Sequence, residues 1–304
     1  MLFSAAFRAK ARAALKQHWQ TALLIALVVS LPSLLVQGLA AYTHTDLMTR
    51  VEDLVLDVYV HPEAANSFTD SLRALLSESG VLLMSALAVL AWLVTPALSI
   101  GMGHWILERL RGQELPVSAV FSRLRIFHKS IGLRLFIVFK VFLWMLPGIA
   151  VTAASVIPVL TADRTYDSLV SAANTSTSII YAGTILMFVL AVMGYLYYAM
   201  ADFILADEPG ERILSCARRS KVMMKGFRGR LFSLVLSFIL WYLVIVLAAS
   251  FIARIAGSVM ALVAEMLGGL FLSVYVTASE GAFYEALRHA PTQESPAEEP
   301  PVME

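Results

Sequence analysis

Five segments of the chain, each longer than twenty residues, contain no Asp, Glu, Lys or Arg. The hydrocarbon core of a bilayer is about 30 Å thick, and a helix that rises about 1.5 Å per residue crosses it with about 20 apolar residues. Hydrophobic residues make up 59% of the chain and charged residues 15%, which is more apolar surface than a water-soluble domain of this length could bury. The five segments therefore predict membrane-spanning helices.

A sixth apolar segment, Val259 to Phe283, is interrupted by Glu265 and Glu280. The residues between the two acids, MLGGLFLSVYVTAS, are too apolar for a water-exposed helix, so we predict a sixth span. The expected fold is all-α, a polytopic membrane bundle in one domain over 1–290. The predicted spans are 19–41, 80–103, 133–160, 179–205, 231–253 and 259–283.

The segments outside the spans differ in charge. Seventeen of the 23 Lys and Arg residues lie before span one, after spans two and four, or in the tail. Because Lys and Arg are retained on the cytoplasmic side, both termini are predicted to be cytoplasmic. The acidic outer loop 42–79 is predicted to form two short helices, either a docking element or a solvated hairpin. The Pro- and Glu-rich tail 291–304 is predicted to be disordered.

Three spans are preceded by similar basic, amphipathic stretches, which indicates an internal repeat of three units. Two of them share Arg-Leu-Phe, at Arg134 and Arg230, followed by Trp144 and Trp241. We predict three interfacial helices that face anionic lipid headgroups, with positive-inside anchoring alone as the alternative. The candidate headgroup contacts are Arg123, Arg125, Lys129, Arg218, Arg219, Lys221 and Lys225.

From about Pro96 to Leu287 the chain also carries a series of short motifs in a fixed order. They include Gly101 and Gly103 ahead of Leu-Arg-Gly, and Trp144-Met-Leu-Pro-Gly-Ile. In their order and spacing the chain resembles an uncharacterised bacterial family of multi-pass integral membrane proteins, related to the membrane domain of some glycerophosphodiester phosphodiesterases. The resemblance implies six helices in the bacterial cytoplasmic (inner) membrane and brings no established activity. Val274 stands where that family has a proline.

The motifs of common enzymes are not found in the sequence. It has no phosphate-binding Gly-Lys-Ser/Thr loop, no Gly-x-Ser-x-Gly elbow and no His-Glu-x-x-His, and its six histidines lack ligand spacing. A single cysteine, Cys216, excludes an internal disulfide framework. We therefore expect no enzyme activity, catalytic residue, cofactor or metal.

Ionisable residues within the spans are candidate functional residues, because charge is costly in hydrocarbon. They are Lys140, Asp202, Glu265 and Glu280. Lys140 is predicted either to extend back to the membrane surface or to pair with Asp202 on the adjacent span. Glu265 lies on an i+4 series of small residues and is predicted to point into the bundle, either with a function or only to orient the span.

These patterns favour a non-enzymatic membrane module that assembles with lipid or a protein partner. The alternative is a carrier or permease for an amphiphile such as a lipid or peptide, with Glu265, Lys140 and Asp202 lining its path. The expected partners are membrane lipids, anionic ones above all, and either a protein partner or a second copy of the chain. A net charge of +1 argues against nucleic acid as a partner.

Overall fold

The structure is a computed structural model that describes residues 4–43, 79–161 and 165–289, with a few residues between 53 and 74. Every regular element in these ranges is a helix, and six candidate spans are long and apolar enough to cross a membrane. The predicted all-α fold with six spans is therefore confirmed. The long helices are α2 (Trp19–Thr43), α5 (Ser79–Leu110), α6 (Phe127–Ala153), α8 (Tyr166–Tyr198), α11 (Arg228–Ala256) and α12 (Ser258–Arg288).

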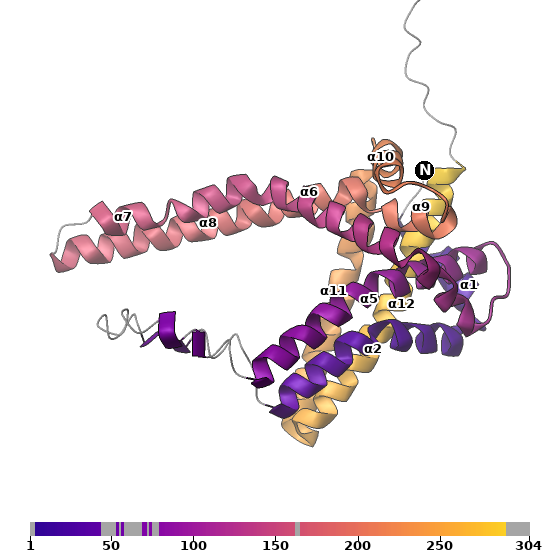
Figure 1. The fold of residues 1–304 in the computed structure, drawn as a ribbon, viewed down its shortest axis with the longest axis horizontal. Coiled ribbons are helices and arrows are strands. Elements are labelled where there is room, and N and C mark those ends of the chain that lie inside the picture. The colour runs from indigo at the N-terminus through magenta and orange to yellow at the C-terminus, as the bar shows by residue number, and fades with distance from the viewer. Residues whose placement is uncertain are drawn as a thin grey trace, which may run out of the picture.

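The long helices form three hairpins, α2–α5, α6–α8 and α11–α12 (Figure 1). Each hairpin follows a short helix that carries basic residues. These are α1 (Ser4–Leu15), the 3-10 helix η2 (Val117–Ile126) and α10 (Ile213–Met223). The repeat of three units expected from the sequence is thus present as three helix–hairpin units. Two further short helices, α7 (Val156–Thr161) and α9 (Ala201–Asp207), follow α6 and α8.

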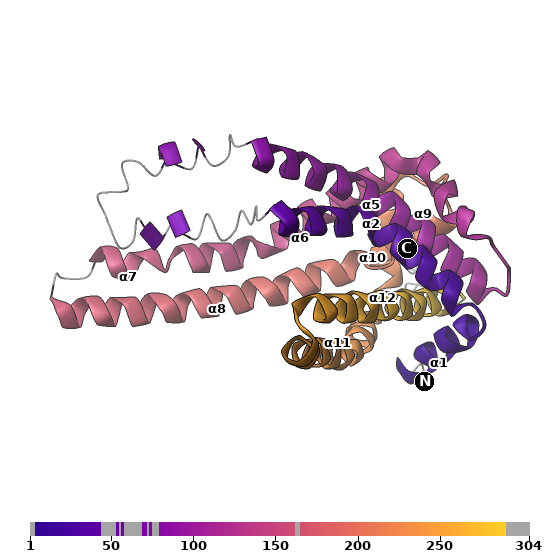
Figure 2. The same cartoon turned by 90° about the horizontal axis from the view of Figure 1, so that it is seen from below.

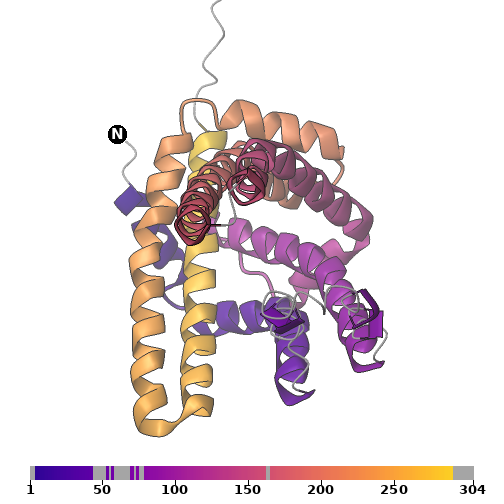
Figure 3. The ribbon, with the colours of Figure 1, turned by 90° about the vertical axis from the view of Figure 1, so that its left-hand side faces the viewer.

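The short helices α1, η2, α9 and α10 gather at one end of the molecule with the adjoining ends of α5, α6, α11 and α12. We call this end the junction. All three hairpins leave the junction on the same side (Figure 2). The α2–α5 and α11–α12 hairpins extend in similar directions, whereas the α6–α8 hairpin diverges from them (Figure 3). Helix α1 contacts α12, so both ends of the described chain lie at the junction.

Most of the core of the protein lies at the junction and in the adjoining turns of the hairpins. Large, fully buried side chains there include Tyr284, Phe283 and Met200. Along the hairpins large apolar side chains are exposed, such as Phe188 at 69% and Leu240 at 68%. Hairpins with this surface are stable where lipid is the solvent, because lipid solvates apolar side chains and the helices satisfy their own backbone hydrogen bonds.

The helices that contain the third and fourth predicted spans have other bounds than those spans. Helix α6, which contains most of the span predicted over 133–160, begins at Phe127, ends at Ala153 and is followed by α7. Helix α8, which contains most of the span predicted over 179–205, begins at Tyr166 and ends at Tyr198, before α9. The extra N-terminal turns of α8 pack against α7, and this contact stabilises a helix in a segment whose polar residues gave no apolar signal. The sixth span is one uninterrupted helix despite Glu265 and Glu280.

The predicted helices of the outer loop 42–79 and the disordered tail 291–304 lie for the most part or wholly outside the described residues.

Candidate functional site

Helix α10 contacts α6, α8 and α9 at the junction, and one of its faces is fully buried. That face consists of Cys216, Ala217 and Ser220, whose small side chains permit close packing. The hydroxyl of Ser220 donates to the carbonyl of Tyr197 at 3.1 Å and accepts from the amide of Met200 at 3.2 Å. Because α8 ends at Tyr198 and α9 begins at Ala201, Ser220 replaces helical hydrogen bonds lost at the break.

The opposite face of α10 and the turn after it combine long apolar and basic side chains. Leu214 and Val222 are 63% and 62% exposed, and Arg218, Lys221 and Lys225 are exposed beside them. The spacing of the first four places them on one face of α10, and Lys225 follows in the turn. None of the three basic side chains forms an ion pair with any residue the structure describes. We call these five residues the α10 face.

The two other basic short helices, η2 and α1, differ in their exposed apolar surface. On η2, the exposed Phe121, Leu124 and Arg125 form a smaller surface of the same kind. On α1, the apolar residues face inward, and the described part of its exposed surface carries only Ala, Gln and basic side chains. The exposed basic residues of α1 and the turn after it are Lys10, Arg12 and Lys16.

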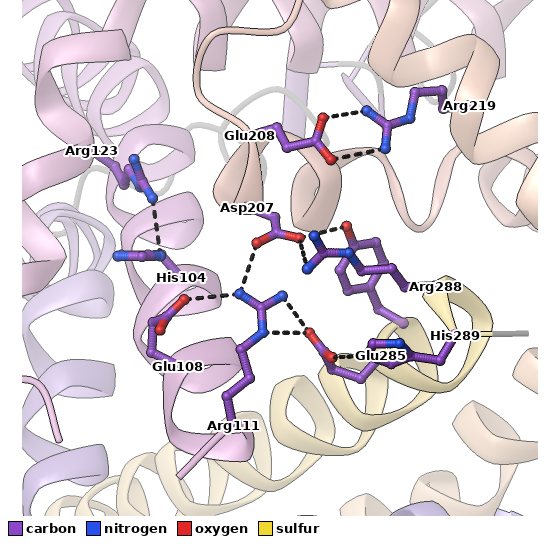
Figure 4. A network of polar contacts seen from close by, with 11 residues as sticks. His104, Glu108, Arg111, Arg123, Asp207, Glu208, Arg219, Glu285, Arg288 and His289 are labelled. Carbon is purple, nitrogen blue, oxygen red and sulfur yellow. Dashed lines mark hydrogen bonds and ion pairs between the residues drawn. The ribbon is translucent and has the colours of Figure 1, made fainter. Parts of the chain in front are cut away.

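An ionic network centred on Arg111 lies at the junction (Figure 4). Arg111 Nη1 donates to Glu108 Oε1 and to Asp207 Oδ1, each at 2.9 Å. Its Nε and Nη2 donate to Glu285 Oε1 at 2.9 and 2.5 Å. One guanidinium therefore joins the ends of α5, α9 and α12, and it uses the planar fork geometry that favours Arg in this role.

The network continues on the far side of Asp207 and Glu285. Arg288 Nη1 lies 2.8 Å from Asp207 Oδ2, and the Tyr284 hydroxyl donates to the same oxygen at 3.1 Å. The side chains of Asp207 and Glu285 are only 7% and 5% exposed. The negative charges of these two nearly buried carboxylates are thus compensated by arginines. The ion pairs fix the relative positions of the helix ends that carry them.

The loop between α9 and α10 is held by a second set of contacts. Arg219 donates to both carboxylate oxygens of Glu208, at 2.5 and 3.0 Å, and to Glu211 at 3.1 Å. The hydrogen bond from Arg219 lowers the pKa of Glu208 below its ordinary value, despite an opposing effect of burial. Lys129 Nζ lies 2.9 to 3.1 Å from the carbonyl oxygens of Pro209, Gly210 and Glu211.

The predicted headgroup contacts fall into two sets. Three of them already have protein partners, namely Lys129, Arg219 and Arg123, whose Nη2 lies 3.0 Å from His104 Nδ1. These three stabilise the junction. The remaining four are exposed and without ion-pair partners among the described residues, and of these Lys221 lies with its Nζ 5.9 Å from the centroid of the Tyr197 ring. They are Arg125, Arg218, Lys221 and Lys225.

The predicted pair between Lys140 and Asp202 is wrong. Asp202 Oδ2 lies 3.6 Å from Arg134 Nη2, and the ammonium of Lys140 lies over the ring of Phe136, 5.7 Å from its centroid. Lys140 lies six residues beyond Arg134 along α6, about 9 Å farther along the helix axis, and the longer, forked side chain of Arg134 reaches the carboxylate instead.

Glu265 does not point into the bundle as expected. It is exposed on α12, because the i+4 series on which it lies rotates around the helix and does not keep one face toward the neighbours. Glu280 is partly buried, and Asp202 lies near enough to act on its charge. The four candidate intramembrane residues therefore do not form one site.

In the sequence Arg111 is the arginine of the family-like Leu-Arg-Gly, but no role was predicted for it, and Asp207 and Glu285 were not singled out. The partners are 96 and 174 residues from Arg111 along the chain. All three are charged residues beyond the ends of predicted spans, where charges are expected in any membrane protein, so no local pattern shows that they pair.

The single cysteine lies at the junction, on the buried face of α10. Cys216 is fully buried, and its burial raises the pKa of the thiol to about 11, which disfavours the nucleophilic thiolate. In the part of the chain that the structure describes, no three His, Cys, Asp or Glu residues are grouped as metal ligands would be.

Comparison with known proteins gave one match. The sequence profile of a family described as a protein of unknown function (DUF975) matches residues 1–291, more of the chain than the 96–287 that the resemblance covered. No curated protein and no solved structure matches the chain. The relation to the membrane domain of glycerophosphodiester phosphodiesterases stays a prediction.

Proposed function

The chain belongs to the DUF975 family of unknown function, and from its own geometry we propose a non-enzymatic membrane module that binds anionic phospholipid through the α10 face. The observation that carries the proposal is the pairing of exposed Leu214 and Val222 with Arg218, Lys221 and Lys225. A helix with this surface lies in the membrane interface, where its apolar side chains enter the acyl boundary and its basic side chains meet phosphates.

The charge on this face is available to a ligand. Each basic side chain near an anionic surface contributes about 1 kcal/mol, so three contribute about 3 kcal/mol, or roughly a hundredfold in affinity. Arg219, on the same helix, is excluded from this sum because Glu208 and Glu211 already bind it. Binding is expected to weaken with salt, since the screening length falls to about 8 Å at physiological ionic strength.

The orientation proposed is that the junction faces the cytoplasm of a bacterial inner membrane, with both termini there. The gathering of the basic helices at one end supports this, since positive residues are retained inside. Cys216 is fully buried and unsuited to a labelling test. Lys225→Cys in a Cys216→Ser background should react with an impermeant maleimide in inverted vesicles and not in spheroplasts; the reverse pattern would reject the orientation.

Assembly with a protein partner or a second copy of the chain remains part of the proposal, and the exposed apolar hairpins provide surface for it. The carrier alternative is less well supported, because it needed Glu265, Lys140 and Asp202 to face one cavity. Asp202 is paired with Arg134, and Glu265 is exposed on a different hairpin from Lys140.

The experiment compares two triple variants that remove equal charge. Arg218→Gln, Lys221→Gln and Lys225→Gln together alter the α10 face. Lys10→Gln, Arg12→Gln and Lys16→Gln alter the α1 region, where the described surface has no exposed large apolar side chain. Purified proteins are reconstituted in nanodiscs with phosphatidylglycerol or with phosphatidylcholine alone, and phosphatidylglycerol bound after delipidation is measured by mass spectrometry at low and high salt.

We expect the wild type to retain phosphatidylglycerol, the α10 variant to lose most of it, and the α1 variant to lose much less. Retention should fall with salt in the wild type and in the α1 variant. Equal losses in both variants would reject a specific α10 face and leave the basic residues as orientation signals only.

A further inference from the structure

A hydroxyl-lined cavity lies between α2, α5 and α12, away from the charged junction. Its volume is about 300 Å³, and Ser30, Ser33, Thr95 and Ser273 contribute hydroxyls to its wall. Apolar side chains complete the lining together with Gly269. The four hydroxyls come from three different helices, so the tertiary arrangement brings them together and not the local sequence.

Two of these hydroxyls have hydrogen-bond partners and two do not. Thr95 donates to the carbonyl of Ala91 at 2.7 Å, and Ser273 donates to that of Leu270 at 2.8 Å. Neither Ser30 nor Ser33 has a side-chain hydrogen bond with any described residue. Such hydroxyls are costly at membrane depth, because hydrocarbon provides no partner.

The backbone of α2 adds an acceptor at the same level. Pro32 lies within α2 and has no N–H, so it cannot donate to the carbonyl of Val28, four residues earlier. Ser30 lies eleven residues beyond Trp19, about 16 Å along the helix, which is close to half the thickness of the hydrocarbon. The Ser30 and Ser33 hydroxyls, which have no described partner, therefore lie near mid-membrane and close along the chain to the carbonyl of Val28.

A larger, apolar groove adjoins this cavity. It has a volume of about 690 Å³, and Leu34 lines both spaces. Leu31, Leu35 and Leu90 on its wall are 47%, 63% and 56% exposed, so the groove is accessible from the surrounding lipid. The remaining lining residues are aliphatic, proline or glycine, and no Asp, Glu, Lys, Arg or His lines either space.

We propose that these two spaces form one binding site for a neutral long-chain lipophile, whose hydroxyl or carbonyl head binds Ser30 and Ser33 and whose chain fills the groove. A charged headgroup is disfavoured, because no opposite charge lines the site and its desolvation would be uncompensated. The combined volume falls in the range of small-molecule pockets, which are about 300–1,000 Å³ and mostly apolar with a few polar groups. The site is independent of the α10 face.

The test uses three diazirine-labelled probes with the same sixteen-carbon chain: an alcohol, a hydrocarbon and a trimethylammonium. The purified full chain in nanodiscs is photolysed with each probe, and the labelled peptides are mapped by mass spectrometry. We expect saturable labelling of α2 and α5 by the alcohol, with weaker labelling by the other two probes. The double variant Ser30→Ala with Ser33→Ala should bind the alcohol probe about tenfold more weakly, as expected for the loss of roughly 1.4 kcal/mol in hydrogen bonds.

A second variant fills the hydroxyl-lined cavity. A Cβ at Gly269 would meet nothing within 4 Å, so Gly269→Leu should keep the fold and abolish saturable labelling. Two controls should leave labelling unchanged. Ser250→Ala removes an exposed hydroxyl that bonds within α11, and Gly229→Leu places a side chain in open space at the start of α11. Thermal unfolding confirms that each variant is folded.

Three outcomes would overturn the proposal. Equal labelling by the hydrocarbon and the alcohol, unaffected by Ser30→Ala with Ser33→Ala, would mean that the groove holds only bulk acyl chains. Stronger labelling by the trimethylammonium would assign a charged ligand. A photocrosslink from a benzoylphenylalanine at Leu90 to the chain's own residues 44–78 would show that this segment occupies the groove.

Discussion

Replacing Arg111 tests whether the ionic network holds the junction together. In Arg111→Gln, Asp207 keeps only Arg288 and Tyr284, and Glu285 keeps only the contact with His289. Breaking a buried ion pair by removing one partner costs about 3–5 kcal/mol. The Arg111 side chain is 24% exposed, and water can therefore screen part of the change, so we expect about 3 kcal/mol. For a chain of this size that corresponds to a melting temperature lowered by about 6 °C.

The measurement is thermal unfolding in a mild detergent, followed by tryptophan fluorescence and by circular dichroism. Arg212→Gln is the matched control, because Arg212 is exposed and its guanidinium forms no ion pair with described residues. A rescue variant combines Arg111→Met with Asp207→Asn and Glu285→Gln, which removes the charge of Arg111 together with those of its two nearly buried partners. It should recover most of the lost stability, since the cost comes from uncompensated charge and not from the missing contacts.

The reasoning would be refuted if Arg111→Gln shifted the melting temperature no more than Arg212→Gln. It would also fail if the triple variant were less stable than the single one, because the network would then contribute more than charge compensation.

Three other substitutions test the packing around the junction and the α6–α8 hairpin. Ser220→Ala leaves the Tyr197 carbonyl and a buried amide unsatisfied, and should lower the free energy of unfolding by about 1–3 kcal/mol in urea titrations. Gly148→Ala should lower the melting temperature and separate α6 from α8 in distance measurements with spin labels, because a Cβ there would lie 2.6 Å from the backbone nitrogen of Met187. Arg219 lowers the pKa of Glu208, so its stabilising effect is complete above the ordinary value of 4.5 and is lost as the pH falls below it. Arg219→Gln should therefore flatten the acid limb of a plot of melting temperature against pH.

Each of these has a control within the chain. Ser237→Ala removes a hydroxyl that bonds only within its own helix, at 2.6 Å to the carbonyl of Leu234, and should cost less than Ser220→Ala. Gly229→Ala adds a methyl group in open space and should be neutral or stabilising. Lys225→Gln removes an exposed charge and should keep the wild-type acid limb. A Gly148→Ala protein as stable as Gly229→Ala would show that the hairpin can relax at that point.

The six spans could be predicted from the sequence because a bilayer imposes a length and a polarity on each segment separately. The boundaries at Phe127 and Tyr166 could not, because both helices continue beyond the apolar segment and depend on contacts with neighbouring elements. Exposure of Arg218, Lys221 and Lys225 was also predictable, since it follows from the local periodicity of one helix.

Contacts between spans were not predictable in the same way. Depth along a helix places Lys140 near Asp202 only if both side chains face each other, and the rotation of a helix is set by its packing. The structure brings Arg134 to that carboxylate and leaves Lys140 on Phe136. The Arg111 network likewise joins residues that only the tertiary fold brings together.

The two sets of basic residues at the junction have complementary physical roles. Lys129 and Arg219 both bind the α9–α10 loop, one through backbone carbonyls and the other through Glu208 and Glu211. Arg111 fixes the end of α9 against α5 and α12. These contacts hold helix α10 in place, so that its exposed charges keep a defined position relative to the hairpins. A preorganised surface loses less conformational entropy when it binds. Under the proposed function, the basic residues that are paired inside the protein therefore favour lipid binding by those that remain unpaired.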